Sequence, residues 1–270
     1  MRGLKRALVA GLVLVLLAGV ATAAVRQLEV TKLPKPQWTR GGASGTAGVR
    51  LVLVSSRRNE ITDTSAWFAR NRLQTREAAL GPLSGGALGS FQGAGLIRAI
   101  RQGDVLLLTY GRDFASGRYL VARESNRPQY AFDFVNYVFA PNGAGYQSVV
   151  WAAQAAGVLY VETSDAGYAR ESDGLNAYVT AIDVKTKKVR WRSRPLVANA
   201  FTFEVVGNVI VTGYGFTDEA DYLYLLDRRT GRVAQRLSVP SAPEFIIRRG
   251  NLLYVRTYDH DLVVKLERKR

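Results

Sequence analysis

The chain has 270 residues, no cysteine and one histidine, and its 37 Lys and Arg against 22 Asp and Glu give a formal net charge of +15. The missing cysteine excludes disulfides, an N-terminal lipid on cysteine and thiolate metal sites, and one histidine is too few for a zinc site with two or three His or Cys ligands. The positive balance predicts either attraction to anionic lipid or acidic polymer, or a soluble basic surface with no particular partner.

The N-terminal 24 residues predict a secretory signal. Three cations within the first six residues precede an uncharged apolar run, Ala7 to Val25, which passes through the small residues Ala21-Thr22-Ala23. The alternative is an uncleaved membrane anchor, because a run of this length just spans a bilayer. We therefore expect an exported protein of the periplasm or cell envelope, with N-terminal anchoring as the alternative.

The next segment, residues 25–48, is expected to be a strand and a linker. Val25 to Leu33 shows partial strand-like alternation, Pro34-Lys35-Pro36 ends it, and Gly41 to Gly48 is a run of small residues. Residues 49–270 are then expected to form a single domain.

That domain begins with weaker signals. Arg50 to Val54 predicts a strand, Ala66 to Arg70 and Arg76 to Leu80 predict weaker ones, and the glycine-rich stretch Gly81 to Gly95 predicts a loop. No helix is expected after the signal.

From residue 96 onward, short apolar runs alternate with Gly, Asn and Asp. Four strand pairs are expected at 96–102 and 105–109, 147–154 and 158–162, 201–206 and 209–212, and 244–249 and 252–256. Third strands are expected at 118–124, 177–183, 221–227 and 261–267, and fourth strands at 129–134, 187–193 and 232–238. Gly-Asn and Gly-Asp between paired strands suit tight hairpin turns, because both residues tolerate a positive φ.

One strand–turn–strand unit occurs twice. Ala177 to Val189 matches Asp221 to Val233, with Asp183 aligned to Asp227 at a spacing of about 44 residues. A repeat of this period with four short strands is typical of a β-propeller blade, so the chain is expected to be an all-β propeller. We expect five blades, counting Arg50 to Leu80 as an incomplete first blade, with four as the alternative. The N-terminal strand at 25–33 would complete the last blade and close the ring.

The repeat resembles that of the pyrroloquinoline-quinone-type, or quinoprotein-like, propellers. The matching residues are Gly207-Asn208, Leu226 to Val233 and Ile182 to Trp191. In the turn, Asp binds the backbone, Thr caps it and Gly takes the left-handed position, which Lys187 occupies in the other copy. The resemblance implies that enzymes of this family hold the quinone against a vicinal disulfide, with a metal beside it. A chain without cysteine is therefore expected to resemble the non-enzymatic branch.

Sorting the connections by face separates the charges. If strands run in order through each blade, the first–second and third–fourth turns share one face, and the second–third loops share the other. The first face collects cations: Arg101, Lys185, Lys187, Lys188, Arg228, Arg229, Arg232, Arg248 and Arg249. The second collects acidic and aromatic residues: Asp113, Asp165, Tyr168, Glu171, Asp173, Tyr214, Phe216, Asp218, Glu219, Asp221, Tyr258, Asp259, His260 and Asp261.

No catalytic, cofactor or metal site is expected. A catalytic triad would have to use His260, and no nucleophile stands near it in the sequence. The stretches Thr217 to Asp221 and Glu171 to Asp173 offer oxygen ligands suited to calcium, without the spacing of a defined loop motif. Trp151 and Trp191 are expected to pack between blades.

We therefore expect a monomeric, non-catalytic propeller that acts as a binding or scaffold module in the cell envelope. Its basic face would meet an anionic polymer, a membrane surface or an envelope protein, and no specific nucleic acid is expected. The alternative is a carbohydrate-active enzyme, a glycosidase or lyase that uses the acidic and aromatic face. Such an enzyme needs carboxylates from inner strands, where the sequence offers only Glu204 and Glu244.

Overall fold

The computed structural model describes residues 28–37, 45–60, 63–80, 88–113, 116–125, 127–138, 147–165 and 167–269. The predicted secretory signal lies outside these residues, and so does the first half of the Gly41 to Gly48 linker. The elements that lie wholly within them are β-strands apart from the helix α1 (Thr64–Arg70) and the 3₁₀ turn η2 (Ala169–Ser172).

The strands form four sheets, here called blades 1 to 4. Blade 1 contains β4 (Ala94–Gln102), β5 (Val105–Gly111), β6 (Tyr119–Glu124) and β7 (Arg127–Asp133), with β1 (Val30–Lys32) and β3 (Ser90–Phe91) at its edges. Blade 2 contains β8 (Ser148–Ala155), β9 (Val158–Ser164), β10 (Tyr178–Asp183) and β11 (Val189–Arg192). Blade 3 contains β12 (Glu204–Val206), β13 (Val209–Tyr214), β14 (Tyr222–Asp227) and β15 (Val233–Ser238). Blade 4 contains β16 (Pro243–Arg249), β17 (Leu252–Thr257), β18 (His260–Arg268) and β2 (Val49–Arg58).

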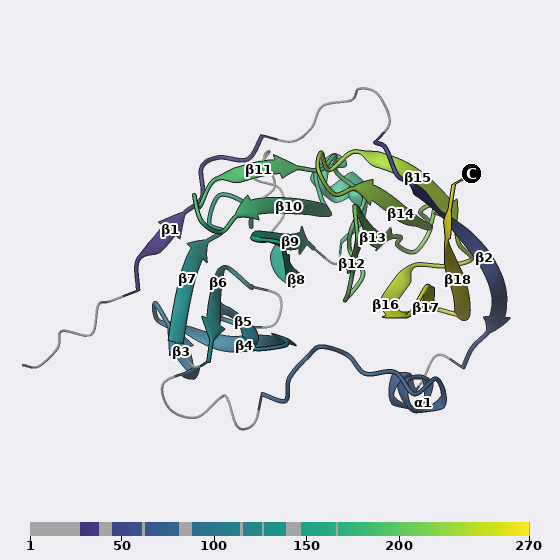
Figure 1. Ribbon diagram of the computed structural model, residues 1–270, viewed down its shortest axis with the longest axis horizontal. Helices are drawn as coiled ribbons and strands as arrows, with labels where there is room; N and C mark the ends of the chain where they lie inside the picture. The colour runs from purple at the N-terminus through teal and green to yellow at the C-terminus, as the bar shows by residue number, and fades with distance from the viewer. Residues whose placement is uncertain are drawn as a thin grey trace, which may run out of the picture.

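The sheets stand side by side around a common centre, as a propeller requires (Figure 1). The strands β8, β12 and β16 lie toward the centre, and β7, β11, β15 and β2 lie on the outside. The predicted all-β propeller is thus confirmed, and nearly every strand predicted from residue 96 onward is present within two or three residues of its expected bounds.

The blade count is four among the described residues, so the expectation of five was wrong and the four-blade alternative holds. Arg50 to Leu80 does not start a blade. Its first part is β2, which pairs antiparallel with β18 over nine residue pairs, from Val49 opposite Arg268 to Arg58 opposite His260. This strand is long enough to cover the whole of the last strand, and a separate sheet would have left the outer edge of β18 unpaired, since β17 pairs only with its inner edge.

Closure of the last blade by a strand from early in the chain was expected, but the segment differs. Val25 to Leu33 contributes only the three-residue β1, which pairs in parallel with β7 on the outside of blade 1. The physical reason is its length, because Pro34 follows at once and cannot donate to a ladder.

Helix α1 replaces the strand predicted at Ala66 to Arg70. The side chain of Asp63 accepts a hydrogen bond from the Ala66 backbone N–H, which caps the helix start. Trp67 is fully buried, and it packs with Leu73 against Ile247 of blade 4. A single buried face on a two-turn helix is too short a signal to be distinguished from a strand by sequence periodicity.

The chain then runs from α1 to blade 1 and occupies the space between the last and first blades (Figure 1). The carbonyl of Arg76 accepts from the Arg101 N–H at 2.7 Å, and the Ala78 N–H donates to the carbonyl of Ala99 at 2.8 Å. Only Glu77 forms a bridge, with Ile100, so the strand predicted at Arg76 to Leu80 is reduced to one residue.

Apolar packing between neighbouring sheets forms the core. One cluster joins blades 1, 2 and 3 through residues such as Phe132, Tyr160 and Leu226. A second joins blades 3 and 4 and includes Leu51 from β2. Trp151 and Trp191 both lie in the first cluster, as expected for side chains that pack between blades.

Candidate functional site

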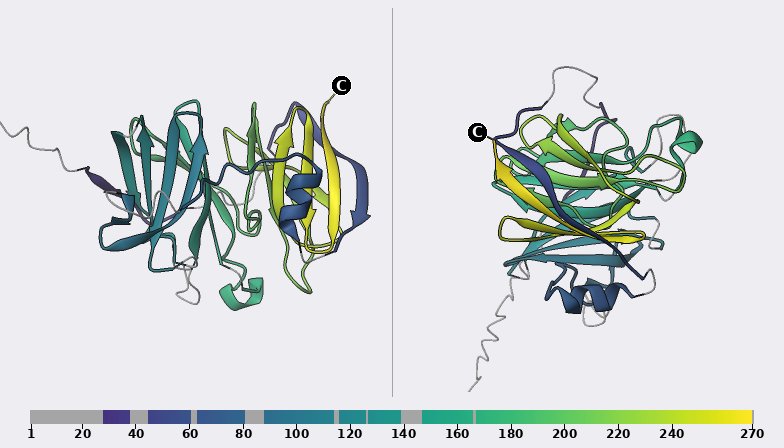
Figure 2. Two further views of the ribbon diagram at one scale, coloured as in Figure 1. Left: turned by 90° about the horizontal axis from the view of Figure 1, so that it is seen from below. Right: turned by 90° about the vertical axis from the view of Figure 1, so that its right-hand side faces the viewer.

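The antiparallel order of each blade places its connections at two opposite ends of the molecule. Figure 2 (left) shows the strands running between these ends. One end carries the short turns β4–β5, β8–β9, β10–β11, β12–β13, β14–β15 and β16–β17, and we call it the basic end. The other carries the longer loops within blades and the connections between blades, and we call it the loop end.

The two repeated turns at the basic end have the chemistry that the sequence suggested. Asp183 Oδ1 accepts hydrogen bonds from the N–H groups of Lys185 and Thr186, and Asp227 Oδ1 accepts one from the N–H of Arg229. Hydrogen bonds from Arg190, followed by those from the Thr186 backbone, hold the pKa of Asp183 below its usual value. These backbone bonds hold each turn without the side chains of Lys185, Lys188, Arg229 and Arg232.

Glycine is required in one of these turns. Gly231 has a φ of +70°, and a Cβ there would lie 2.3 Å from the ring of Trp191. The indole of Trp191 also donates to the Arg228 carbonyl at 3.1 Å, so blade 2 packs directly against the turn of blade 3. Lys187 takes the equivalent left-handed position in the other copy, with a φ of +58°.

All the predicted cations lie at the basic end, but three of them are engaged. The guanidinium of Arg228 donates to Tyr160 Oη and to the Gly207 carbonyl. Lys187 pairs with Glu29 at 3.0 Å, and Arg248 donates to the Gly250 carbonyl. Six others are exposed and have no side-chain partner among the described residues: Arg101, Lys185, Lys188, Arg229, Arg232 and Arg249.

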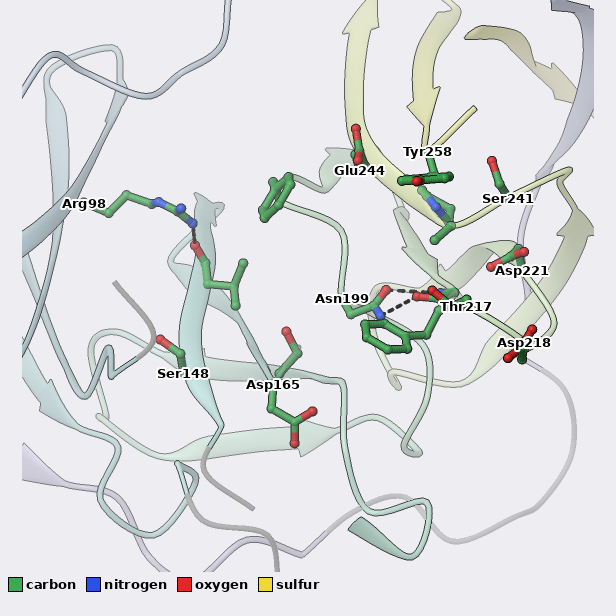
Figure 3. A pocket seen from close by; sticks show the side chains of 17 residues that line it. Arg98, Ser148, Asp165, Asn199, Thr217, Asp218, Asp221, Ser241, Glu244 and Tyr258 are labelled. Carbon is green, nitrogen blue, oxygen red and sulfur yellow. Dashed lines mark hydrogen bonds between the residues drawn. The ribbon is translucent and has the colours of Figure 1, made fainter. Parts of the chain in front are cut away.

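The loop end brings some of the predicted acidic and aromatic residues together in a pocket of about 550 Å³. Figure 3 shows Arg98 and Ser148 on one side of it and Asp221, Glu244 and Tyr258 on the other. The pocket is lined by Arg98, Ser148, Val150, Ser164, Asp165, Asn199, Phe201, Gly215, Phe216, Thr217, Asp218, Asp221, Ser241, Ala242, Pro243, Glu244 and Tyr258. All four blades contribute, because the pocket lies where their inner strands begin.

Asp221 is the most perturbed carboxylate of the pocket. Burial, followed by repulsion from Asp259 and Glu219, raises the pKa of Asp221 from 3.8 to about 6. Its Oδ1 is buried and has no hydrogen-bond partner among the described residues. A Cβ on Gly215 would lie 1.9 Å from that oxygen, so the carboxylate occupies space that only glycine leaves free.

Asn199 positions the loop that carries Asp221. Its Nδ2 donates to the Gly215 carbonyl at 2.7 Å, and its Oδ1 accepts from the Gly215 N–H at 3.2 Å (Figure 3). Both backbone groups of Gly215 are thus held by one side chain that comes from the connection between blades 2 and 3. The sequence analysis missed this residue, since nothing in a lone Asn indicates that it will face a glycine 16 residues away.

The two inner-strand carboxylates have different surroundings. Glu244 lines the pocket, and burial raises its pKa although Arg256 opposes the shift. Glu204 is buried away from the pocket, where it accepts from Arg76 Nη2 at 2.9 Å and from the Arg248 N–H at 3.2 Å. Of the two carboxylates that a carbohydrate-active enzyme could use, only Glu244 is therefore in place.

The remaining predicted residues of the loop end take structural roles outside the pocket. Tyr214 Oη donates to Glu219 at 2.5 Å, and Asp261 accepts from Asn59 and Arg256. Asp173 follows η2 with a φ of +50°.

Ser241, Asp259 and His260 come together but do not form a catalytic triad. Ser241 Oγ donates to Asp259 Oδ1, and His260 Nδ1 contacts the same oxygen at 2.7 Å. Both bonds end on the carboxylate, so the imidazole does not stand between serine and aspartate as general-base activation requires.

Neither a metal cluster nor a membrane span is found in the described part of the chain. It contains no group of three or more His, Cys, Asp or Glu side chains that could hold a metal ion. The calcium ligands suggested by the 217–221 and 171–173 stretches therefore remain an expectation from sequence. No helix in the same residues is long and apolar enough to cross a bilayer.

Comparisons with known proteins give distant structural likenesses. No protein-family model and no curated protein matches the sequence. BamB from Moraxella catarrhalis is similar with 13% identity and a TM-score of 0.42, over 63% of this chain and 42% of that one. The computationally designed Ika4 protein is similar with 11% identity and a TM-score of 0.41, over 69% of this chain and 99% of that one. A europium-containing methanol dehydrogenase is similar with 14% identity and a TM-score of 0.36, over 72% of this chain and 28% of that one. The chain thus spans less than half the length of BamB, and these values add nothing to the fold that its own strand pairing shows.

Proposed function

We propose that the protein is an exported, non-catalytic propeller of the cell envelope that binds an anionic surface through its basic end. The observation that carries the proposal is the set of exposed cations in the turns of neighbouring blades 2 and 3: Lys185, Lys188, Arg229 and Arg232. Because Asp183 and Asp227 already satisfy these turns, the cations have no structural task and remain free to contact phosphate or carboxylate groups.

Binding to vesicles tests this proposal. Full-length protein is mixed with vesicles of neutral lipid, with and without an anionic lipid, and the bound fraction is measured as salt is raised. Each Lys or Arg near an anionic bilayer contributes about 1 kcal/mol, so Arg229→Ser with Arg232→Ser is expected to weaken binding about thirtyfold. The bound fraction is also expected to fall with salt.

The control variant removes the same charge elsewhere. Arg57→Ser with Arg112→Ser takes away two exposed arginines from the loop-end side of the molecule, where Arg57 pairs with the residue next to His260. Equal loss in both variants would indicate that only the net charge matters, and an unchanged affinity in the first would contradict the proposal. Arg228 and Lys187 are left intact because both have partners in the fold.

A carbohydrate-active enzyme is the second candidate function, and one observation favours it. Asp221, with its pKa raised to about 6, shares a pocket with Glu244, and glycoside hydrolysis uses one protonated and one ionised carboxyl. Hydrolysis or elimination of an envelope polysaccharide, abolished by Asp221→Asn and Glu244→Gln but not by Glu204→Gln, would establish it. Absence of turnover on acidic and neutral polysaccharides would leave the binding module.

A further inference from the structure

The pocket at the loop end has an excess of negative charge. Its lining includes four carboxylates, Asp165, Asp218, Asp221 and Glu244, and one cation, Arg98. The Arg98 guanidinium is already engaged, since it donates to the Val150 carbonyl and to Glu77 Oε1. It therefore does little to neutralise the opposite wall of the pocket.

Three of these carboxylates lack strong partners. Asp165 is satisfied by the Gly167 N–H at 2.8 Å and the Asn176 amide at 2.6 Å. Asp218 is exposed, and its side chain has no partner among the described residues. Glu244 approaches Arg256 only to 3.9 Å, and the Oδ1 of Asp221, buried against Gly215, has no donor within the described residues. Burying carboxylates with so little compensation is unfavourable, so a ligand that brings positive charge beside them would relieve this cost.

The neighbouring groups add negative charge and little positive charge near Asp221. Asp259 and Glu219 both repel it. Of the nearby basic groups, His260 contacts Asp259, and Arg256 lies against Asp261 at 3.3 Å. The local charge therefore favours a cation from outside the chain.

The rest of the lining is apolar and aromatic. Phe201 and Tyr258 are 47% and 55% exposed, unusually high values for large side chains, and both face the pocket. Ala242 and Pro243 form a further apolar wall. Aromatic faces beside carboxylates are suited to organic cations through cation–π contacts, whereas a bare metal ion requires a closer set of oxygens.

We propose that this pocket binds an organic cation, a guanidinium or an alkylammonium group whose stem lies between Tyr258 and Phe201. Asp221 and Glu244 receive the charged head, Asp218 contributes at the open side, and Asn199 holds the loop that carries Asp221. A volume of about 550 Å³ accommodates a small molecule or one residue of a bound peptide with its stem. The basic end takes no part, so this inference is independent of the proposed surface binding.

Calorimetric titration of the full-length protein tests the proposal with paired ligands. The ligands are acetyl-Gly-Arg-Gly-amide and its citrulline analogue, which keeps the shape and removes the charge. Agmatine and spermidine represent free cations, and chitotriose represents a neutral sugar. The arginine peptide or the free cations are expected to bind, with an affinity that falls as salt rises, and the citrulline peptide is expected to bind at least about tenfold more weakly.

The two cation sources are distinguished in the same experiment. Tighter binding of the peptide than of agmatine assigns the pocket to a side chain of a partner protein, and the reverse assigns it to a free cation. Equal binding of the arginine and citrulline peptides, or binding of chitotriose alone, overturns the proposal.

Variants then locate the site. Asp221→Asn and Glu244→Gln are each expected to reduce affinity about tenfold, because each removes a charged acceptor. Asp104→Asn is the matched control, as Asp104 is exposed in the β4–β5 turn at the basic end. Asp218→Asn is a further pocket variant at an exposed position, and it can still locate the site if a substitution at a more buried position disturbs folding. Equal affinity in all four variants would place the cation elsewhere and refute the assignment.

Discussion

The two ends of this propeller differ in how their charged side chains are placed: exposed at the basic end and packed into the fold at the loop end. At the basic end, the short turns satisfy their own backbone through Asp183 and Asp227, and most cations have no side-chain partner in the part of the chain that the structure describes. At the loop end, the carboxylates are drawn into the fold, where one is deprived of donors and others bind tyrosine, asparagine or arginine. Loop length accounts for the difference, because tight turns expose their side chains while longer connections can fold inward.

This contrast makes the two ends separable by mutation. Charge at the basic end is expected to affect binding and leave stability unchanged. Charge at the loop end is expected to affect both, since the same carboxylates shape the pocket and experience its low polarity.

The largest effect on stability is expected at Gly231 of the basic end, where the backbone conformation and the packing matter and charge does not. Gly231→Ala forces a side chain into a left-handed position and against the Trp191 ring, which should reduce the free energy of unfolding by about 2 to 4 kcal/mol. Urea denaturation followed by tryptophan fluorescence measures it. Lys187→Gly is the control, because it relieves the same φ in the other copy and should be neutral or slightly stabilising. If Lys187→Gly reduced the free energy of unfolding as much as Gly231→Ala does, the two turns would not be equivalent in their need for glycine.

A smaller effect is expected from removing the Asn199 side chain, which holds the backbone of Gly215 at the loop end. Asn199→Ala removes both hydrogen bonds to the Gly215 backbone and should cost about 1 to 3 kcal/mol. Asn208→Ala, at an exposed turn of the basic end, should cost far less. Thermal denaturation of the two variants compares them directly, and equal melting temperatures would remove the positioning role of Asn199.

The pH dependence of stability gives a more subtle test of the loop end. Since folding raises the pKa of Asp221 from 3.8 to about 6, its contribution is most favourable below pH 4 and is lost as the pH rises through 6. Asp221→Asn stays neutral, so the variant should gain about 1 kcal/mol relative to the unmodified protein between pH 4 and 7, after allowance for solvent screening. Urea midpoints at several pH values measure this difference. A constant difference across that range would mean that Asp221 titrates normally.

The smallest effect is expected from removing the free cations. Replacing Lys185, Lys188, Arg229 and Arg232 with Ser should change the free energy of unfolding by less than about 0.5 kcal/mol per site, because exposed charges without partners contribute little. Denaturation in low and high salt measures it. A large loss would show that the basic end uses its charges structurally, and the contrast between the two ends would disappear.

The sequence was sufficient to predict the strands of each blade, but not which strand completes the last blade. Strand pairs such as 204–206 with 209–214 follow from alternating apolar residues and Gly-Asn turns, and the Asp183 and Asp227 turns are as expected. The pairing of β2 with β18 could not be read, because contacts between residues more than 200 positions apart leave no local pattern. Helix α1 was missed for a related reason, since its burial depends on Ile247 of a distant blade.

The candidate site was predictable in composition but not in arrangement. The acidic and aromatic loops were assigned to one face, and Phe216, Asp218, Asp221 and Tyr258 do line the pocket. The sequence could not indicate that Asp261 and Glu219 would be bound by other side chains, nor that Arg98, Asn199 and Ser241 would join the lining. These residues belong to strand starts and connections, whose neighbours depend on how the blades are arranged in space.

The pairing of β2 with β18 also affects how the protein is made. Arg50 lies opposite Glu267, 217 residues later in the chain, so β2 leaves the ribosome long before its partner exists. Through synthesis and any passage across a membrane, β2 is an unpaired strand that other chains could join, and Arg50, Arg57 and Arg58 make such contacts unfavourable through repulsion. Completion of blade 4 must therefore be among the last events of folding, and a chaperone that shields β2 would be expected to raise the yield.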